Sequence, residues 1–317
     1  MGVFFGALHD WYSVHSDLIN TSGLNGILAL SIYVMLACGQ LSLASPAYMA
    51  VGAYTAAMLT VNTGAPFALQ LVAGSLLAAG VAFTLGLPLL RLRGVYLAIS
   101  TVGFVSIVQI FFNTWSPGGG GDGISIPATT TTADIYVALA ILCFIFWRLE
   151  GSAVGRSFKA IRQDEEAARS LGINTVAHKL AAFAVSGLVA GLAGVLYARL
   201  SFFIEPKNFD FDTGLNALVY VIVGGSLTFL GSPAGALLIT MLPEFLRYLG
   251  TAGRAGAVPG LSNLLTLMHD YRNVMDGIIL LAVILYLPGG LVDLPARLWR
   301  PVRLALARQR TEGAPAS

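Results

Sequence analysis

Charged residues and cysteines are scarce in this sequence. Asp, Glu, Lys and Arg together make up 11% of its 317 residues, whereas hydrophobic residues make up 56%, more than in soluble globular domains. The two cysteines, Cys38 and Cys143, fall inside apolar runs, which is typical of small buried hydrophobes and not of a disulfide framework. The four histidines are single and scattered, so we expect no metal site. The net charge of +2 gives no indication of a nucleic-acid partner.

Long apolar runs dominate the sequence instead. A helix that crosses a bilayer needs about 20 predominantly apolar residues, and most of these runs have that length or nearly so. The apolar segments are residues 18–38, 44–62, 67–90, 94–113, 133–149, 179–203, 213–229, 232–249 and 274–291. The whole chain, 1–317, is therefore expected to be a single all-α polytopic membrane domain, a bundle of about eight to ten transmembrane helices.

Several of these segments are interrupted by glycine and proline. The clearest case is GQLSLASPAYMAVGAY, around Pro46. Irregular backbone at membrane depth is tolerated only where protein or a water-filled cavity satisfies the freed backbone groups, so we expect broken or re-entrant segments near the centre of the bundle. In SGLVAGLAGVLYA, by contrast, Gly187, Gly191 and Gly194 have the spacing of small residues that let helices pack closely within the bundle.

Positive charge predicts the orientation, because Lys and Arg concentrate in cytoplasmic loops. Three basic segments are expected on that side: Arg91 with Arg93, residues 148–179, and the tail 293–317. The loops then expected outside are 114–132, 204–212 and 250–273. Counting back places the N-terminus outside as well. If the piece around Pro46 is re-entrant and does not span, the N-terminus lies inside instead.

One dense polar stretch, DEEAARSLGIN, begins at Asp164 between two apolar segments. One continuous helix from about 155 to 171 is possible. Two short helices agree better with the capping signals: Asp164 would cap the second helix, and Glu165 and Glu166 would lie in its first turn. Gly172 would end that helix in the left-handed conformation. Either arrangement predicts a surface helix, which is either part of a solvated loop or a docking element for a soluble partner.

A phosphate-binding loop is not expected in this chain. Gly118–Gly121 form a glycine-rich run, but no GxxxxGK[ST] pattern occurs. We therefore expect no directly bound cofactor, and any ATP would be used by another subunit.

The polar stretch resembles a known signature, since EAARSLG matches the EAA-x-x-x-G pattern in permease subunits of bacterial ABC importers. Nearly the whole chain is similar to the LivM-type permease of branched-chain amino-acid importers. The similar segments, in order, are GQLSLASPAYMAVGAYTAAML, LPLLRLRGVYLAISTVGF, GGGGDGIS, GRSFKAIRQDEEAARSLGINTVAHKLAAFAVSGLVAGLAGVLYA, ALVYVIVGGSLTFLGSPAGALLITMLPE and LPGGLVDL.

The resemblance implies a multi-pass permease of the bacterial inner membrane, surrounded by lipid, that is not itself an enzyme. Separate ABC ATPase subunits would hydrolyse ATP, a second permease of LivH type would complete the pore, and a periplasmic binding protein would deliver substrate. Residues 150–178 would form a cytoplasmic coupling loop that docks on the ATPase. The residues expected to make that contact are Gly155, Arg156, Arg162, Glu165, Glu166, Ala167, Ala168 and Gly172.

The expected substrates are branched-chain amino acids, with urea, short amides and aromatic acids as alternatives, because permeases for these also resemble this group. The chain departs from the family pattern where Ala44 and Ser45 replace a Gly-His pair before Pro46, and at Asp122 in the glycine-rich loop. The residues expected along the substrate pathway are Gln40, Ser42, Ser45, Gly52 and Tyr96.

Two other classes were compared with an ABC permease: a secondary transporter and a membrane-embedded enzyme. Coupled transporters often place ionisable side chains inside the membrane, but the first four apolar segments contain no Asp, Glu, Lys or Arg in their cores. The apolar segments also show no His/Asp/Glu cluster or metal-ligand spacing typical of a catalytic site. Both patterns favour the permease.

Overall fold

The computed structural model describes residues 2–92, 94–127 and 130–254. The elements in chain order are α1 (Gly2–Ala37), α2 (Ser45–Thr63), α3 (Phe67–Leu89), α4 (Val95–Thr114), the 3-10 turns η1 (Ser116–Gly118) and η2 (Gly120–Asp122), β1 (Ile124–Ser125), α5 (Thr132–Gly151), α6 (Ala153–Gln163), α7 (Glu165–Ser170), α8 (Thr175–Leu200), β2 (Phe203–Ile204), the 3-10 turn η3 (Pro206–Phe209), α9 (Phe211–Gly224) and α10 (Gly231–Arg254). The predicted apolar segment 274–291 and the basic tail 293–317 lie outside the described residues.

The fold is an all-α polytopic bundle, as the sequence predicts. Five described helices are long and apolar enough to cross a membrane: His15–Ala37 of α1, and α3, α4, α5 and α8. Alongside them lie α2 with 19 residues, α9 with 14 and α10 with 24. The predicted segment 213–229 is longer than α9, because the chain leaves the helix after Gly224. With 14 residues at 1.5 Å each, α9 is about 21 Å long and is too short to cross the bilayer alone.

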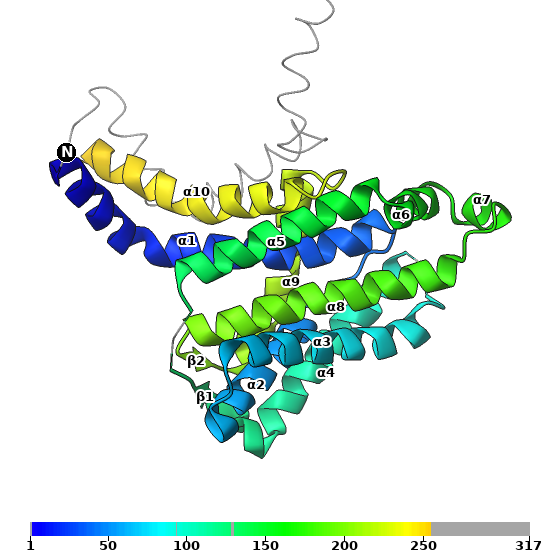
Figure 1. Ribbon diagram of the computed structural model, residues 1–317, viewed down its shortest axis with the longest axis horizontal. Helices are drawn as coiled ribbons and strands as arrows, with labels where there is room; N and C mark the ends of the chain where they lie inside the picture. Colours follow the sequence, from blue (N-terminus) through cyan, green and yellow to red (C-terminus); the bar gives the residue numbers. More distant parts are fainter. Residues whose placement is uncertain (1, 93, 128–129, 255–317) are drawn as a thin grey trace, which may run out of the picture.

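The bundle has two distinct ends (Figure 1). The short helices α6 and α7 lie at one end, between α5 and α8. At the other end β1 pairs with β2 in a two-stranded antiparallel sheet, with Ile124 opposite Ile204. This sheet joins the glycine-rich loop after α4 to the chain that leaves α8. We call the two ends the α6–α7 end and the β end.

Helix α8 is the centre of the packing, and glycines allow its neighbours to approach closely. A Cβ atom on Gly187 would lie 2.3 Å from the Cβ of Ala82 in α3, and one on Gly194 would lie 2.0 Å from the Met49 carbonyl oxygen in α2. Gly191 meets both helices, since its backbone contacts Gly52 in α2 and a Cβ on it would lie 2.5 Å from the Cβ of Ala78. The predicted role of these glycines in packing within the bundle is confirmed.

The N-terminal helix runs toward the α6–α7 end, since Gly39, just after α1, contacts the backbone of Arg162 at the end of α6. At the β end, the Arg199 guanidinium donates to Gln70 near the start of α3 (2.8 Å). Only three residues separate the end of α2 at Thr63 from the start of α3 at Phe67, so α2 runs from the α6–α7 side to the β end. The helix that begins around Pro46 therefore leads from the α6–α7 side to the β end and is not re-entrant. Since α1 ends at the α6–α7 end, its start lies on the opposite side of the bundle.

Candidate functional site

The polar stretch folds as two short helices and not as one. Asp164 has extended backbone (φ −156°, ψ 112°) and separates α6 from α7. Its carboxylate accepts hydrogen bonds from the backbone N–H groups of Glu166 (2.9 Å) and Ala167 (3.0 Å), which is the N-cap predicted from the sequence. Such a cap contributes about 1 kcal/mol. The segment between the spanning helices α5 and α8, residues 152–174, is slightly shorter than the predicted loop 150–178.

The C-terminal end of α7 also follows the prediction. Gly172 has φ +82°, a left-handed conformation that suits glycine. The Ile173 N–H donates to the Ala168 carbonyl (3.1 Å) and the Gly172 N–H to the Arg169 carbonyl (3.0 Å). These two bonds form a Schellman motif, so α7 has defined caps at both ends although it contains only six residues.

An apolar seam holds α6 and α7 against the bundle. Phe158, Ile161 and Ala168 are all buried. Gly155 allows α6 to fold back on the end of α5, since a Cβ there would lie 2.3 Å from the Leu149 carbonyl oxygen. Of the residues predicted to contact an ATPase, Gly155 and Ala168 therefore secure the element to this chain.

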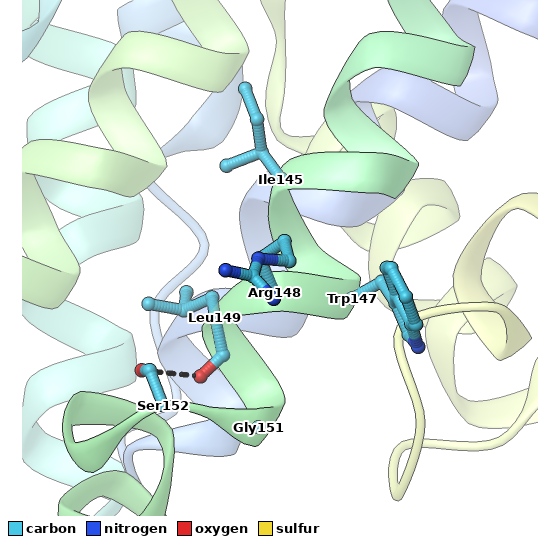
Figure 2. A pocket seen from close by; sticks show the side chains of 6 residues that line it. All are labelled: Ile145, Trp147, Arg148, Leu149, Gly151 and Ser152. Atoms are coloured by element: carbon cyan, nitrogen blue, oxygen red, sulfur yellow. Dashed lines mark hydrogen bonds between the residues drawn. The ribbon is translucent and has the colours of Figure 1, made fainter.

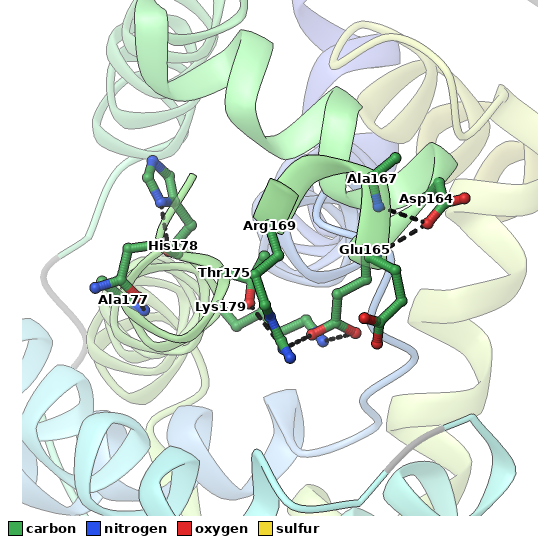
Figure 3. A network of polar contacts seen from close by, with 10 residues as sticks. Asp164, Glu165, Ala167, Arg169, Thr175, Ala177, His178 and Lys179 are labelled. Carbon is green, nitrogen blue, oxygen red and sulfur yellow. Dashed lines mark hydrogen bonds and ion pairs between the residues drawn. The ribbon is translucent and has the colours of Figure 1, made fainter. Parts of the chain in front are cut away.

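Glu165 connects α7 to the first turn of α8 (Figure 3). Its carboxylate accepts a hydrogen bond from Lys179 Nζ at 2.7 Å, and Arg169 Nη2 lies 3.3 Å away. The Glu165 and Lys179 side chains are only 23% and 13% exposed, so this pair is less screened by solvent than an ordinary surface pair. Arg169 also donates to the Thr175 hydroxyl (3.3 Å). The sequence could not reveal this network, because Lys179 lies 14 residues away.

The opposite face of α7 points away from the bundle. Arg156, Glu166, Ala167 and Gly172 are all exposed, as a docking surface requires. Leu171, which the sequence analysis did not single out, is 80% exposed, the highest value among the exposed large hydrophobic side chains of the described residues. Val176, in the first turn of α8, is 54% exposed. Leu171 and Val176 are therefore apolar side chains exposed on an otherwise polar surface element.

Arg162 links α6 to the loop between α9 and α10. Its guanidinium donates to the Ser226 carbonyl (3.0 Å) and to the Ser226 hydroxyl (3.4 Å). Glu150, at the end of α5, accepts from the Phe229 N–H in the same loop (3.0 Å) and from the hydroxyl of Tyr33 in α1. The ends of α5 and α6 are therefore hydrogen-bonded directly to the α9–α10 loop. The sequence predicted Arg162 as a coupling residue but not its partners.

The break between α1 and α2 lies directly next to this linkage. Helix α1 ends in the same way as α7, with φ +76° at Gly39 and a hydrogen bond from the Gln40 N–H to the Met35 carbonyl (2.9 Å). Cys38 at this point is fully buried.

Side chains satisfy the backbone where the chain re-enters the bundle. The Leu43 N–H donates to the Thr101 hydroxyl of α4 (3.0 Å), and the Ala44 N–H donates to the Ser42 hydroxyl (3.4 Å). The hydroxyl oxygens of Ser45 and Ser31 are 2.7 Å apart. Ser31 lies six residues before the end of α1, so α2 begins about 9 Å inside the α6–α7 end. This is the broken segment that the sequence predicts.

The structure brings together three of the five predicted pathway residues. Gln40, Ser42 and Ser45 are buried in this break. Gly52 instead lies at the contact between α2 and α8, where a Cβ would be 2.2 Å from the Gly191 carbonyl oxygen. Tyr96 is 73% exposed on the first turn of α4 and stands apart from the others.

An open surface recess of about 590 Å³ lies where α5 meets α6 (Figure 2). Ile145, Arg148 and Leu149 line one side of it, and Trp147 projects from the other side of α5. Tryptophan and arginine at the end of an apolar helix are typical of the level where a membrane meets water. The recess has few convergent polar groups, which a binding site for a small solute would need. We therefore interpret it as a feature of the membrane–water boundary.

Comparison with known proteins agrees with these features. A family model described as "Branched-chain amino acid transport system / permease component" matches residues 15–284. The high-affinity branched-chain amino acid transport system permease protein LivM of Escherichia coli strain K12 is 32% identical over 308 residues, covering 86% of this chain and 66% of that protein. LivM of Salmonella typhimurium gives the same identity and coverage. This chain thus spans just under two thirds of the length of these relatives.

A more distant relative is the autoinducer 2 import system permease protein LsrC of Escherichia coli O9:H4. It is 26% identical over 164 residues, which cover 47% of each protein. No solved structure matches the chain.

Proposed function

This chain belongs to the family of branched-chain amino acid transport permease components, and we propose that it is the membrane-spanning subunit of an ATP-driven importer for branched-chain amino acids. The observation that carries the proposal is α7, a capped helix that presents Leu171 and Glu166 away from the bundle while Glu165 and Arg169 tie it to α8. An element that is fixed to the bundle and exposed at its tip can transmit movement from a soluble partner.

The proposed orientation places the α6–α7 end in the cytoplasm and the β end outside. Arg156, Lys159, Arg162 and Arg169 at the α6–α7 end support this arrangement through the positive-inside rule. The N-terminus then lies outside. The tail 293–317, which the sequence predicts to be cytoplasmic, lies outside the described residues.

The proposed mechanism begins at a pair of ABC ATPase subunits. ATP binding closes the pair, and the docked α7 moves with α6. Arg162 transmits this movement to Ser226 in the α9–α10 loop, and the contact with Gly39 transmits it to the break before α2. The bundle thereby changes between two access states. A second permease of LivH type completes the pore, and a periplasmic binding protein delivers the substrate.

The absence of charge among the buried polar side chains of the described residues supports transport that is driven by a separate ATPase subunit. The buried polar side chains of the described residues are serines, threonines, asparagine and glutamines. Proton-coupled transporters instead use ionisable groups within the membrane.

Ser45, which departs from the family pattern, forms a hydrogen bond with Ser31, so this departure has a structural role. This role does not distinguish branched-chain amino acids from urea, short amides or aromatic acids, so the uptake experiment includes all of these substrates.

Reconstitution of the tagged chain with its partner subunits tests the proposal. Proteoliposomes are given ATP and radiolabelled leucine, isoleucine, valine, urea, acetamide or benzoate, with a hydrolysis-deficient ATPase as the control. We expect ATP-dependent uptake of the three branched-chain amino acids and co-purification of an ATPase subunit. Uptake driven by an ion gradient without ATP refutes an importer of this class, and ATP-dependent uptake of urea, acetamide or benzoate alone refutes the substrate assignment.

A further inference from the structure

A cavity of about 290 Å³ opens between α1, α2, the end of α8 and the start of α9. Its lining residues are Thr21, Leu24, Asn25, Leu28, Met49, Tyr197, Leu200, Ser201, Asn208 and Thr213. We propose that this cavity, which we call the chamber, holds one branched-chain amino acid on its way through the permease. The inference rests on the proposed function and assigns the place where the substrate waits.

The chemistry of the chamber fits a neutral or zwitterionic solute with an aliphatic part. None of its lining residues carries a charge. Leu24, Leu28, Met49 and Leu200 supply an apolar wall, while the amides and hydroxyls supply hydrogen-bonding groups. Sites for small molecules commonly combine a mostly apolar lining with a few placed polar groups. A carboxylate side chain would lose its hydration here without gaining an opposite charge from the lining.

Neighbouring helices fix the orientation of the polar groups. Asn25 donates from its amide nitrogen to the hydroxyls of Tyr220 (3.3 Å) and Thr240 (3.0 Å). This arrangement leaves the carbonyl oxygen of Asn25 as the group that can accept a hydrogen bond from an ammonium. Thr213 is held by Asp210, whose carboxylate accepts from both its N–H and its hydroxyl at 2.9 Å. Pre-oriented groups bind a solute with a lower entropic cost.

The broken segment lies about one helical turn from the chamber. Leu28 and Met49 line the chamber, and about one helical turn beyond them, toward the α6–α7 end, the hydroxyls of Ser31 and Ser45 meet. Ser42 and Gln40 follow along the same route and lead to Gly39, which contacts Arg162. The chamber therefore lies close to the segment that the coupling helices contact. We expect movement of the start of α2 to release a solute from it.

A second cavity provides an internal comparison. It has about 500 Å³ between α2, α3 and α4, and is lined largely by apolar side chains such as Met58, Leu77 and Phe111. Met49 and Met58 thus lie on the same helix but in different cavities. The second cavity also has a few polar lining residues, Thr55, Asn62 and Thr63, but shares no lining residue with the chamber.

Cysteine protection tests the chamber directly. Asn208→Cys, Thr213→Cys and, as the matched control, Met58→Cys are made in a Cys143→Ser background, because Cys38 is fully buried and unreactive. The assembled complex in proteoliposomes is treated with a small uncharged thiol reagent, with or without L-leucine. Because only the unliganded fraction reacts, leucine at ten times its dissociation constant should slow modification of the first two cysteines about tenfold.

The specificity controls decide between the outcomes. L-glutamate should not protect either chamber cysteine, because its side chain is charged, and leucine should not protect Met58→Cys. The proposal is overturned if leucine leaves the chamber cysteines unprotected, if they cannot be modified, or if protection occurs at Met58→Cys instead. Protection needs no ATP, whereas uptake does. Protection without ATP-driven uptake therefore refutes the proposed function alone, and uptake without protection refutes the chamber alone.

Discussion

Gly172 allows the role of α7 to be tested by backbone conformation alone. Its φ of +82° is a left-handed conformation, and a Cβ added there would meet nothing within 4 Å. A substitution therefore introduces no clash, and its effect comes only from the backbone. The substitutions Gly172→Asn, Gly172→Ala and Gly172→Val form a series, because asparagine tolerates this region best and a β-branched residue tolerates it least.

The expected magnitude follows from the cost of left-handed backbone. For alanine this cost is about 1–2 kcal/mol, which lowers the ratio of folded to frayed α7 by roughly 5- to 30-fold. Valine costs more, and asparagine less. A helix of six residues has no stability of its own, so it depends on the Asp164 cap, the Glu165 ion pairs and the Gly172 turn. All three lie outside the membrane-spanning helices.

The assay is substrate-stimulated ATP hydrolysis by the assembled complex, with membrane abundance measured in parallel. Stimulation should fall in the order Gly172, Gly172→Asn, Gly172→Ala, Gly172→Val, and co-purification of the ATPase should fall with it. All four proteins should reach similar abundance, because their substitutions lie outside the membrane-spanning helices.

Three results would refute this reasoning. Normal stimulation in Gly172→Val would show that docking does not need the α7 turn. Equal damage in Gly172→Asn and Gly172→Val would show that a side chain, and not backbone strain, causes the defect. Loss of abundance in Gly172→Val would indicate that the loop serves folding of the bundle instead.

Four further substitutions, with Gly80→Ala as a control, test other links. Leu171→Asp, like Glu166→Lys, should weaken ATPase binding in a pull-down without lowering membrane abundance, since both residues face away from the bundle; unchanged binding in both would exclude this face as the interface. Arg162→Ala should reduce leucine uptake per ATP hydrolysed, because it removes both hydrogen bonds to Ser226, and an unchanged ratio would contradict the transmission route. Gly194→Ala should lower the amount of folded protein, since its Cβ would lie 2.0 Å from the Met49 carbonyl oxygen. Gly80→Ala, whose Cβ would have nothing within 4 Å, serves as the control. Equal abundance of the two variants would argue against close packing of α2 on α8.

Local signals in the sequence determined the membrane class and the shape of the coupling element. Asp164 and Gly172 predicted both ends of α7, because N-caps and left-handed C-terminal turns depend on residues only a few positions apart. The glycines of α8 predicted close packing for a similar reason, since their spacing places them on neighbouring turns of one helix face. The length of α9 was predicted less well, because an apolar run does not show where the chain leaves the helix.

Only the tertiary structure decided how these elements connect. Arg162 meets Ser226 across 64 residues of sequence, and Lys179 meets Glu165 across a turn between two helices. The chamber combines side chains from α1, α2, α8, η3 and α9. Tyr96 and Gly52 lie apart from the buried serines with which they were grouped. Contacts of this kind depend on how whole helices pack, and the hydrophobic pattern that drives the packing shows which face is buried but not which partner covers it.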